Sequence, residues 1–262
     1  WSKSFISYHI IPMVSAIWSM PPYEAGKMPM NFFLKFFQNH GLFKLRNRPQ
    51  WFTVSQRSKT YVNKVLSKIS GEYFKNYKIK SVKRISSGVQ VYYGGNDEFF
   101  EYDKVVLATH ADETLALIEN PTEEETKVLS NFNYRENFAV LHSDEKMMPK
   151  NKKAWSSWNS FVDPKDLNKS SLSYWLNLLE NLKIEKNIFL TLNPFREIPE
   201  EKIFKKIKFS HPYFDQKALD NQKNLQKIQN KQNLLFCGSY FGYGFHEDGI
   251  KSSIEMIKNI ND

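Results

Sequence analysis

The chain has 262 residues, of which 41% are hydrophobic and 15% aromatic, so it can build a packed core and does not belong to the disordered class. Its formal net charge is +9, but arginine is scarce and the lysines are spread along the chain, which argues against a nucleic-acid partner. The single cysteine, Cys237, excludes an internal disulfide framework and a multi-cysteine metal centre.

The remaining chemistry-bearing residue types narrow the function further. Cys237 stands in an apolar run, which favours a buried role over a reactive thiol. The six histidines show no HxxxH or similar spacing, so we expect no metal site. The longest apolar stretch, residues 5–20, is interrupted by His9 and Pro12 and is too short to span a bilayer.

Helices are predicted for the first part of the chain. Residues 1–45 read as helices that are broken at Pro12 and Pro21-Pro22 and end near Gly41. Within them, the run 32–37 is interpreted as a buried helix face, with contact to a lipid or an apolar substrate as the alternative. A further helix is predicted from Ser58 to about Ile69, because its apolar residues repeat with helical spacing. Since the chain begins with Trp1, we interpret it as part of a longer protein.

Short strands follow. The ranges 78–85, 89–93 and 98–102 are predicted strands, and Gly94-Gly95-Asn96-Asp97 is the expected hairpin turn between the last two. The β-branched run 104–109 is typical of a strand buried on both faces of a parallel sheet.

The middle of the chain alternates between helix and strand. Helices are predicted over 113–119 and from Pro121, where Thr122 is the expected N-cap and Glu125 completes a capping box. A helix is also predicted from about Phe214 to Gln229. The predicted strands of this part are Phe138–His142, Ala154–Trp158, Leu172–Leu176, Asn187–Leu192 and Ile203–Phe209.

The most informative stretch is the last one. The apolar run 234–236 leads into a glycine-rich turn and then a helix that starts near Asp248, whose inward residues are expected to be Ile250, Ile254 and Ile257. Glycines allow close backbone approach, and a helix N-terminus offers unpaired N–H groups to a phosphate or an electron-rich ring. The alternative is a connector that uses its glycines only to turn.

The order of elements indicates the fold class. Val105–Ala108 and Leu234–Phe236 are the best candidates for neighbouring buried strands in one sheet, although they lie far apart in the sequence. The section between them is then an inserted second domain, and ligands commonly bind in a cleft between two such domains. We therefore predict a mixed α/β protein.

Several long motifs in this order resemble the flavin-containing amine oxidase and phytoene desaturase superfamily, in particular its branch of bacterial predicted NAD/FAD-binding proteins. The main ones are DKVVLATHAD (103–112) and FCGSYFGYGFHEDG (236–249). The supporting stretches are IIPMVSAIWSMPP (10–22), NHGLFKLRNRPQWFTV (39–54), VLHSDEKMMPKNKKAWSSWN (140–159), LSYWLNLLENL (172–182) and FSHPYFD (209–215).

The resemblance implies a partial Rossmann-like FAD domain interleaved with a substrate domain of mixed sheet and helices. The implied FAD-domain parts are residues 51–118 and 233–262, and the implied substrate-domain parts are 1–50 and 119–232. The resemblance places the C-terminal motif beside the flavin, with the helix N-terminus at Asp248-Gly249 directed at its ring. The implied cofactor contacts are Gly238, Ser239, Tyr240, Gly242, Tyr243, Gly244, Phe245, His246, Glu247, Asp248 and Gly249, together with Trp51 and Ser58.

The chain departs from the family pattern in two ways. No three of its glycines have the G-x-G-x-x-G spacing, so the first βαβ unit, which holds the ADP half of FAD, is missing. After RPQW-TV the family has a Gly-Gly-Ser turn, whereas this chain has Ser55-Gln56-Arg57-Ser58 and keeps only Ser58.

The expected function is that of an FAD-dependent oxidoreductase of which this chain is the C-terminal portion. By resemblance it acts on an apolar or amine-bearing small molecule, with a lipid or isoprenoid included, by hydride transfer to the flavin. Catalytic residues cannot be assigned, and the substrate-facing candidates are Trp155, Trp158, Tyr174 and Trp175. We expect a cytoplasmic protein with peripheral membrane contact. The alternatives are a degenerate, non-catalytic relative that no longer binds FAD, and a basic protein that binds nucleic acid or anionic membrane.

Overall fold

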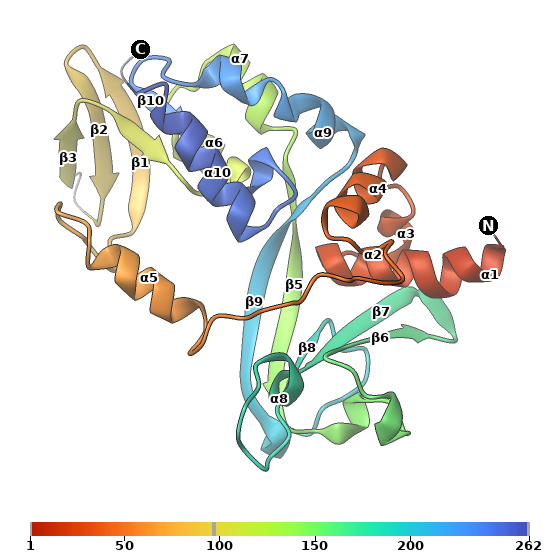
Figure 1. The fold of residues 1–262 in the computed structure, drawn as a ribbon. Coiled ribbons are helices and arrows are strands. Elements are labelled where there is room, and N and C mark those ends of the chain that lie inside the picture. The colour runs from red at the N-terminus through yellow and green to blue at the C-terminus, as the bar shows by residue number, and fades with distance from the viewer. Residues whose placement is uncertain (1, 96–97, 261–262) are drawn as a thin grey trace. The chain divides into compact units, whose positions relative to one another are not determined.

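The computed structural model describes residues 2–95 and 98–260 of the chain (Figure 1). The chain divides into two compact units: unit 1 comprises Trp1–Gly71 and Arg135–His211, and unit 2 comprises Glu72–Tyr134 and Pro212–Asp262. Each unit combines two separate stretches of sequence. Both contain helices and strands, which confirms the predicted mixed α/β class. The assignment of the four sequence ranges to a flavin domain and a substrate domain stays a prediction.

Unit 2 contains two small sheets. In the first, β1 (Ile79–Ile85), β2 (Gly88–Tyr93) and β3 (Glu98–Tyr102) pair in antiparallel order. The expected turn between β2 and β3 falls partly outside the described residues, because Asn96 and Asp97 are not among them. In the second sheet, β4 (Val105–Leu107) pairs in parallel with β10 (Leu234–Phe236), so the prediction that these two distant runs are neighbours is confirmed.

Four helices accompany these strands: α6 (Ala111–Leu117), α7 (Glu123–Leu129), α9 (Gln216–Gln222) and α10 (His246–Ile257). The predicted capping box of α7 is confirmed. The Glu125 N–H donates to Thr122 Oγ1 at 3.1 Å, and the Thr122 N–H donates to the Glu125 carboxylate at 2.8 Å. The single helix predicted over 214–229 is wrong, because α9 ends at Gln222 and a separate 3₁₀ turn covers 225–228.

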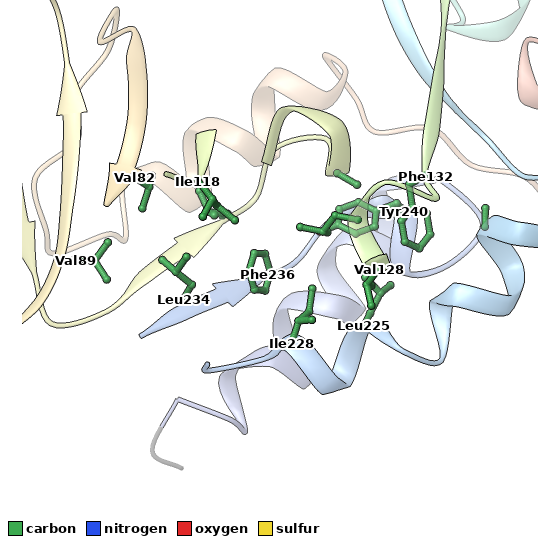
Figure 2. Packing of buried hydrophobic residues seen from close by; sticks show 14 residues of the cluster. Val82, Val89, Ile118, Val128, Phe132, Leu225, Ile228, Leu234, Phe236 and Tyr240 are labelled. Carbon is green, nitrogen blue, oxygen red and sulfur yellow. The ribbon is translucent and has the colours of Figure 1, made fainter. Parts of the chain in front are cut away.

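The strand β10 organises the core of unit 2. Leu234 and Phe236 point from one face into a cluster that also contains Leu225, Ile228 and Val128 (Figure 2). Leu235 and Cys237 point from the other face, where Met256 of α10 covers them. Cys237 is thus buried, as predicted. Alternate residues of one strand are therefore buried on both sides, which is the environment of a strand in a parallel sheet.

The two edges of this small sheet differ. On the outer side of β10, the Phe236 N–H donates to Gln229 Oε1 at 3.0 Å, and Gln229 Nε2 donates back to the Phe236 carbonyl at 2.8 Å. On β4, by contrast, β10 is the one strand partner among the described residues. Val106 of β4 is 42% exposed, so the prediction of burial on both faces is wrong there. The reason is that nothing described covers that side of β4.

Unit 1 holds α1 (Lys3–Phe5), α2 (Ile11–Trp18), α3 (Pro22–Ala25), α4 (Met30–Asn39), α5 (Ser58–Leu66) and α8 (Leu176–Leu179). The predicted break at Pro12 is wrong. A π-helical turn over 6–10, in which the Ile11 N–H donates to the Ile6 carbonyl, leads directly into α2, so the helix continues through Pro12. In α4, Phe33, Phe36 and Phe37 are buried, which confirms the interpretation of 32–37 as a buried helix face.

The sheet of unit 1 has the order β6-β7-β8-β5-β9. Its strands are β5 (Asn133–His142), β6 (Trp158–Asp163), β7 (Asp166–Trp175), β8 (Phe189–Leu192) and β9 (Ile203–Tyr213). The strand predicted over 154–158 is wrong. Asn151 accepts a hydrogen bond from the Lys153 N–H and starts a 3₁₀ turn over 152–154, so the strand begins only at Trp158.

A row of buried polar side chains crosses one face of this sheet. His142 Nε2 and Thr191 Oγ1 are 2.7 Å apart, and Thr191 Oγ1 and Ser173 Oγ are also 2.7 Å apart. The second ring nitrogen of His142, Nδ1, accepts the Asp144 N–H at 3.0 Å. These bonds fit a neutral imidazole that donates from Nε2. Burial of the ring lowers the pKa of His142 to about 4.

The buried imidazole makes stability depend on pH. The pKa of His142 is about 4 in the folded protein against 6.5 ordinarily, so the unfolded chain binds the proton first as the pH falls. The stabilisation is complete above pH 6.5 and is lost between pH 6.5 and pH 4. We expect the free energy of unfolding to decrease by about 3 kcal/mol over this interval.

Urea unfolding followed by circular dichroism at both ends of that interval measures the loss. The His142→Gln variant should be less stable at neutral pH, but its free energy of unfolding should change less over the interval. His9→Gln, at an exposed position, should keep the wild-type change with pH. Equal slopes for wild type and His142→Gln would contradict the assignment.

Candidate functional site

The candidate site is the turn between β10 and α10, which lies wholly within unit 2. The Gly238 N–H donates to Ser252 Oγ at 2.9 Å, and Ser252 Oγ donates to the Gly249 carbonyl at 2.7 Å, so one side chain of α10 holds both the start of the turn and the first turns of the helix. The Gln222 amide of α9 donates to the carbonyls of Tyr240 and Gly242 at 3.1 and 2.6 Å. Ser252 and Gln222 were missed by sequence reasoning because neither lies in a recognisable motif.

Three glycines of the turn are required by packing within the protein itself. A Cβ on Gly238 would lie 2.6 Å from the Tyr240 ring, and one on Gly242 would overlap the Asp248 carboxyl group. Gly244 has φ +93°, and its Cβ would lie 2.9 Å from the Phe214 ring. These three glycines therefore serve the packing of a compact turn, as expected if the turn only connects β10 to α10.

The start of α10 differs from the prediction. The helix begins at His246 with Phe245 as N-cap, two residues before the expected start at Asp248-Gly249. Asp248 is the third helical residue, and its carboxylate accepts the Phe245 N–H at 3.0 Å. Glu247 also lies in this first turn, so two carboxylates partly neutralise the partial positive charge of the helix N-terminus. The dipole is thus already partly compensated by the helix's own residues.

The buried face of α10 also differs from the prediction. Ile250, Ile254 and Ile257 are 54–57% exposed, whereas Ser252 and Met256 are buried. The small residues at 249, 252 and 253 let the helix approach the turn closely, so this face of α10 packs against the turn. The isoleucines form a stripe at the next face of the helix.

Tyr240 lies in the core of unit 2. It is 1% exposed and lies beside Phe132 (Figure 2), with their ring centres 5.2 Å apart. The ring of Phe241 is 4.9 Å away. Burial raises the pKa of the phenol. Its hydroxyl has no hydrogen-bond partner among the described residues. Of the other expected contacts, Ser239 and Tyr243 are half-buried, while Phe245, His246 and Glu247 are exposed.

One backbone group of the turn is suited to an external acceptor. Among the described residues, no hydrogen-bond acceptor pairs with the Ser239 N–H. Gly249 leaves space beside it, since a Cβ at Gly249 would lie 3.9 Å from Ser239 N and have no nearer neighbour. An unpaired amide next to a missing side chain is a place where a phosphate or carbonyl oxygen can approach backbone.

The two remaining cofactor candidates belong to unit 1. Trp51 is 66% exposed, and Ser58 is the exposed first residue of α5. Just before it, Gln56 has φ +61° and Arg57 has φ +69°. The left-handed region is normally taken by glycine, so the backbone here has the conformation that suits the two glycines expected from the resemblance, although the residues differ.

The expected aromatic set of unit 1 forms two separate pairs. The rings of Trp158 and Tyr174 are 5.2 Å apart, edge to face, and so are those of Trp155 and Trp175. Tyr174 and Trp175 are consecutive in β7, so they point to opposite faces of the sheet. Both indoles of the second pair donate their N–H, Trp155 to the Pro149 carbonyl and Trp175 to Asn187. The four rings therefore do not line one common wall.

The described residues contain neither a metal site nor a membrane-spanning helix. Across residues 2–95 and 98–260, no group of three or more His, Cys, Asp and Glu side chains is arranged to hold a metal ion. In the same ranges no helix has the length and apolar character that a membrane span requires.

Comparison with known proteins gives relatives by structure alone. No protein-family profile and no curated protein matches the chain. Among solved structures, cyclohexylamine oxidase from Brevibacterium oxydans IH-35A is 11% identical with a TM-score of 0.60, and the match covers 100% of this chain and 66% of that one. A candidate protoporphyrinogen oxidase from Exiguobacterium sp. 255-15 is 11% identical with a TM-score of 0.63, over 98% and 64%.

Two further structures share this fold over about four fifths of the chain. Putrescine oxidase bound to putrescine is 10% identical with a TM-score of 0.53, over 79% of this chain and 53% of that one. A fatty acid isomerase from P. acnes that produces CLA is 13% identical with a TM-score of 0.53, over 77% and 51%. The chain thus spans between about half and two thirds of the length of these proteins. At such identities the likeness shows a shared fold, that of several oxidases.

The turn yields a test by paired glycine substitutions. Gly244→Ala places a methyl group against Phe214 at a positive φ, so we expect the free energy of unfolding to fall by about 2 kcal/mol. Gly249→Ala places its methyl group within a helix at an ordinary contact distance of 3.9 Å from Ser239 N, so stability should rise by up to about 1 kcal/mol. Urea unfolding of the two variants measures the difference, and equal losses would contradict the described packing.

Proposed function

We propose that this chain is the C-terminal portion of an FAD-dependent oxidoreductase of the amine-oxidase type. It would oxidise an apolar or amine-bearing small molecule by hydride transfer to the flavin. The fold shared with cyclohexylamine oxidase and putrescine oxidase supports this class of reaction. The observation that carries the proposal is the Ser239 amide beside Gly249, since residue 249 places no side chain against this backbone donor.

In this proposal the turn after β10 binds the cofactor. When bound, FAD supplies the acceptor for the hydride. The Ser239 N–H would donate to an oxygen of the cofactor, and Gly249 would let the cofactor lie close to the helix. The partly exposed residues Tyr243, Phe245 and His246 would border the ring. Tyr240 would contribute through its backbone, because its side chain is in the core.

We further propose that the ADP half of FAD is held by a unit that packs against β4 and is not part of this chain. Three observations support such a unit. The free edge of β4 has no described strand partner, Val106 is exposed on one face of β4, and α10 carries the exposed isoleucine stripe. Parallel strands are normally covered on both faces, so an additional strand and helix would complete this sheet. In the two oxidases that match nearly all of this chain, about a third of their own length lies outside the match.

The alternative is a degenerate relative that no longer binds FAD. The side chains of Gln56 and Arg57 favour it, since they occupy left-handed positions where the resemblance expects glycine. The Gln56→Gly/Arg57→Gly double variant removes these side chains and distinguishes the two possibilities. Flavin uptake by this variant but not by the wild type would support the alternative.

Flavin binding is the direct test. The protein produced at its natural length should purify with the visible absorbance of a flavin, and anaerobic addition of cyclohexylamine or putrescine should bleach it if the substrate is an amine. Gly249→Ala should lower FAD affinity at least tenfold, about 1.4 kcal/mol, because its methyl group covers the Ser239 amide. Fluorescence titration with FAD measures this.

The control is Ser253→Ala, a neighbouring substitution on α10 that leaves Gly249 unchanged. It should keep wild-type affinity for FAD, and unfolding curves should show that both variants are folded. A natural-length protein that takes up no FAD, with or without the Gln56 and Arg57 side chains, would overturn the proposed function.

A further inference from the structure

The net charge of the protein is concentrated in one stretch of unit 1. Residues 25–71 contain nine basic residues and no aspartate or glutamate, whereas the rest of the chain has 28 basic and 28 acidic residues. The whole formal charge of +9 therefore belongs to this stretch, which we call the cationic segment. Its basic residues are Lys27, Lys35, Lys44, Arg46, Arg48, Arg57, Lys59, Lys64 and Lys68.

These charges are available to a partner. All nine basic side chains belong to exposed residues. Within the described part of the chain, one of them is in an ion pair, between Arg57 and Glu180 at 3.7 Å. Since no acidic residue interrupts the segment, its positive potential is not cancelled locally.

The same segment exposes large apolar side chains. Leu45 is 91% exposed and Phe52 88%. Further along, α5 has no buried residue, and its apolar residues Val62 and Val65 are exposed together with Ile69 beyond its end. Val62 and Val65 lie three residues apart in α5, so they share one face of the helix, while Lys64 lies on another.

We propose that the cationic segment binds an anionic lipid surface. A helix with an exposed apolar face and flanking lysines lies in the plane of a membrane interface, with its apolar face in the headgroup region. The exposed apolar side chains of Leu45 and Phe52 before it suit the same depth, and each nearby lysine or arginine adds attraction to acidic lipids. Nucleic acid would use the same cations, but it would leave Leu45, Val62 and Val65 in water. The proposed lipid contact uses neither Trp51 nor Ser58, the cofactor candidates of this segment.

Vesicle sedimentation tests it. The natural-length protein should sediment with vesicles in which about a third of the lipid is phosphatidylserine, bind poorly to pure phosphatidylcholine vesicles, and be released by about 1 M salt. Lys59→Gln/Lys64→Gln/Lys68→Gln should weaken binding about a hundredfold, at about fivefold per lysine. Val62→Ser/Val65→Ser should weaken it at least tenfold, because the apolar face no longer inserts.

The matched control removes the same number of charges elsewhere. Lys217, Lys223 and Lys227 are exposed residues of unit 2 in no described ion pair, and their replacement by glutamine should leave vesicle binding within about twofold. Equal loss in this control would show attraction by net charge alone and overturn the proposal. So would absence of sedimentation, or a valine variant that binds like wild type while duplex DNA competes with the vesicles.

Discussion

The parallel pairing of Leu234–Phe236 with Val105–Leu107 is the interaction on which the rest of unit 2 depends. It closes a long loop of sequence, and the apolar residues on both faces of β10 compensate the entropy of that closure. Once the strands are paired, the glycine turn emerges beside β4, and α10 must fold back over Leu235 and Cys237. The position of the candidate site is thus a consequence of burial and needs no ligand to define it.

The turn itself shows how packing and binding share the same residues. Gly238, Gly242 and Gly244 are fixed by the Tyr240 ring, the Asp248 carboxyl group and the Phe214 ring. At Gly249, by contrast, the nearest atom to an added Cβ would be Ser239 N at 3.9 Å, an ordinary contact distance. A glycine-rich sequence therefore does not by itself identify a cofactor site, because most of its glycines serve the chain's own compactness. The informative glycine is Gly249, because the packing of the protein itself does not require a glycine at that position.

Much of this fold could be predicted from local chemistry, and the errors have physical causes. The capping box at Thr122 and the pairing of the two buried runs depend on short, strong patterns. The inward face of α10 was predicted wrongly, because the isoleucines carry the helical apolar signal while close packing selects the small residues. The start of that helix was predicted two residues late, since Phe245 is not a typical N-cap residue. The separation of the four aromatic rings depends on strand register, which composition does not contain.

Gln229 has a consequence for how molecules of this protein can associate. Its carboxamide supplies one donor and one acceptor to Phe236, the same pair that a residue of an adjacent strand would supply. Among the described residues, this sheet is therefore closed at β10 by a side chain and open at β4. The unit proposed to pack against β4 would pair with the open edge, so the completed sheet could not add strands at β10 and would extend only away from it. The Gln229 carboxamide thus protects this side of the sheet from edge-to-edge association.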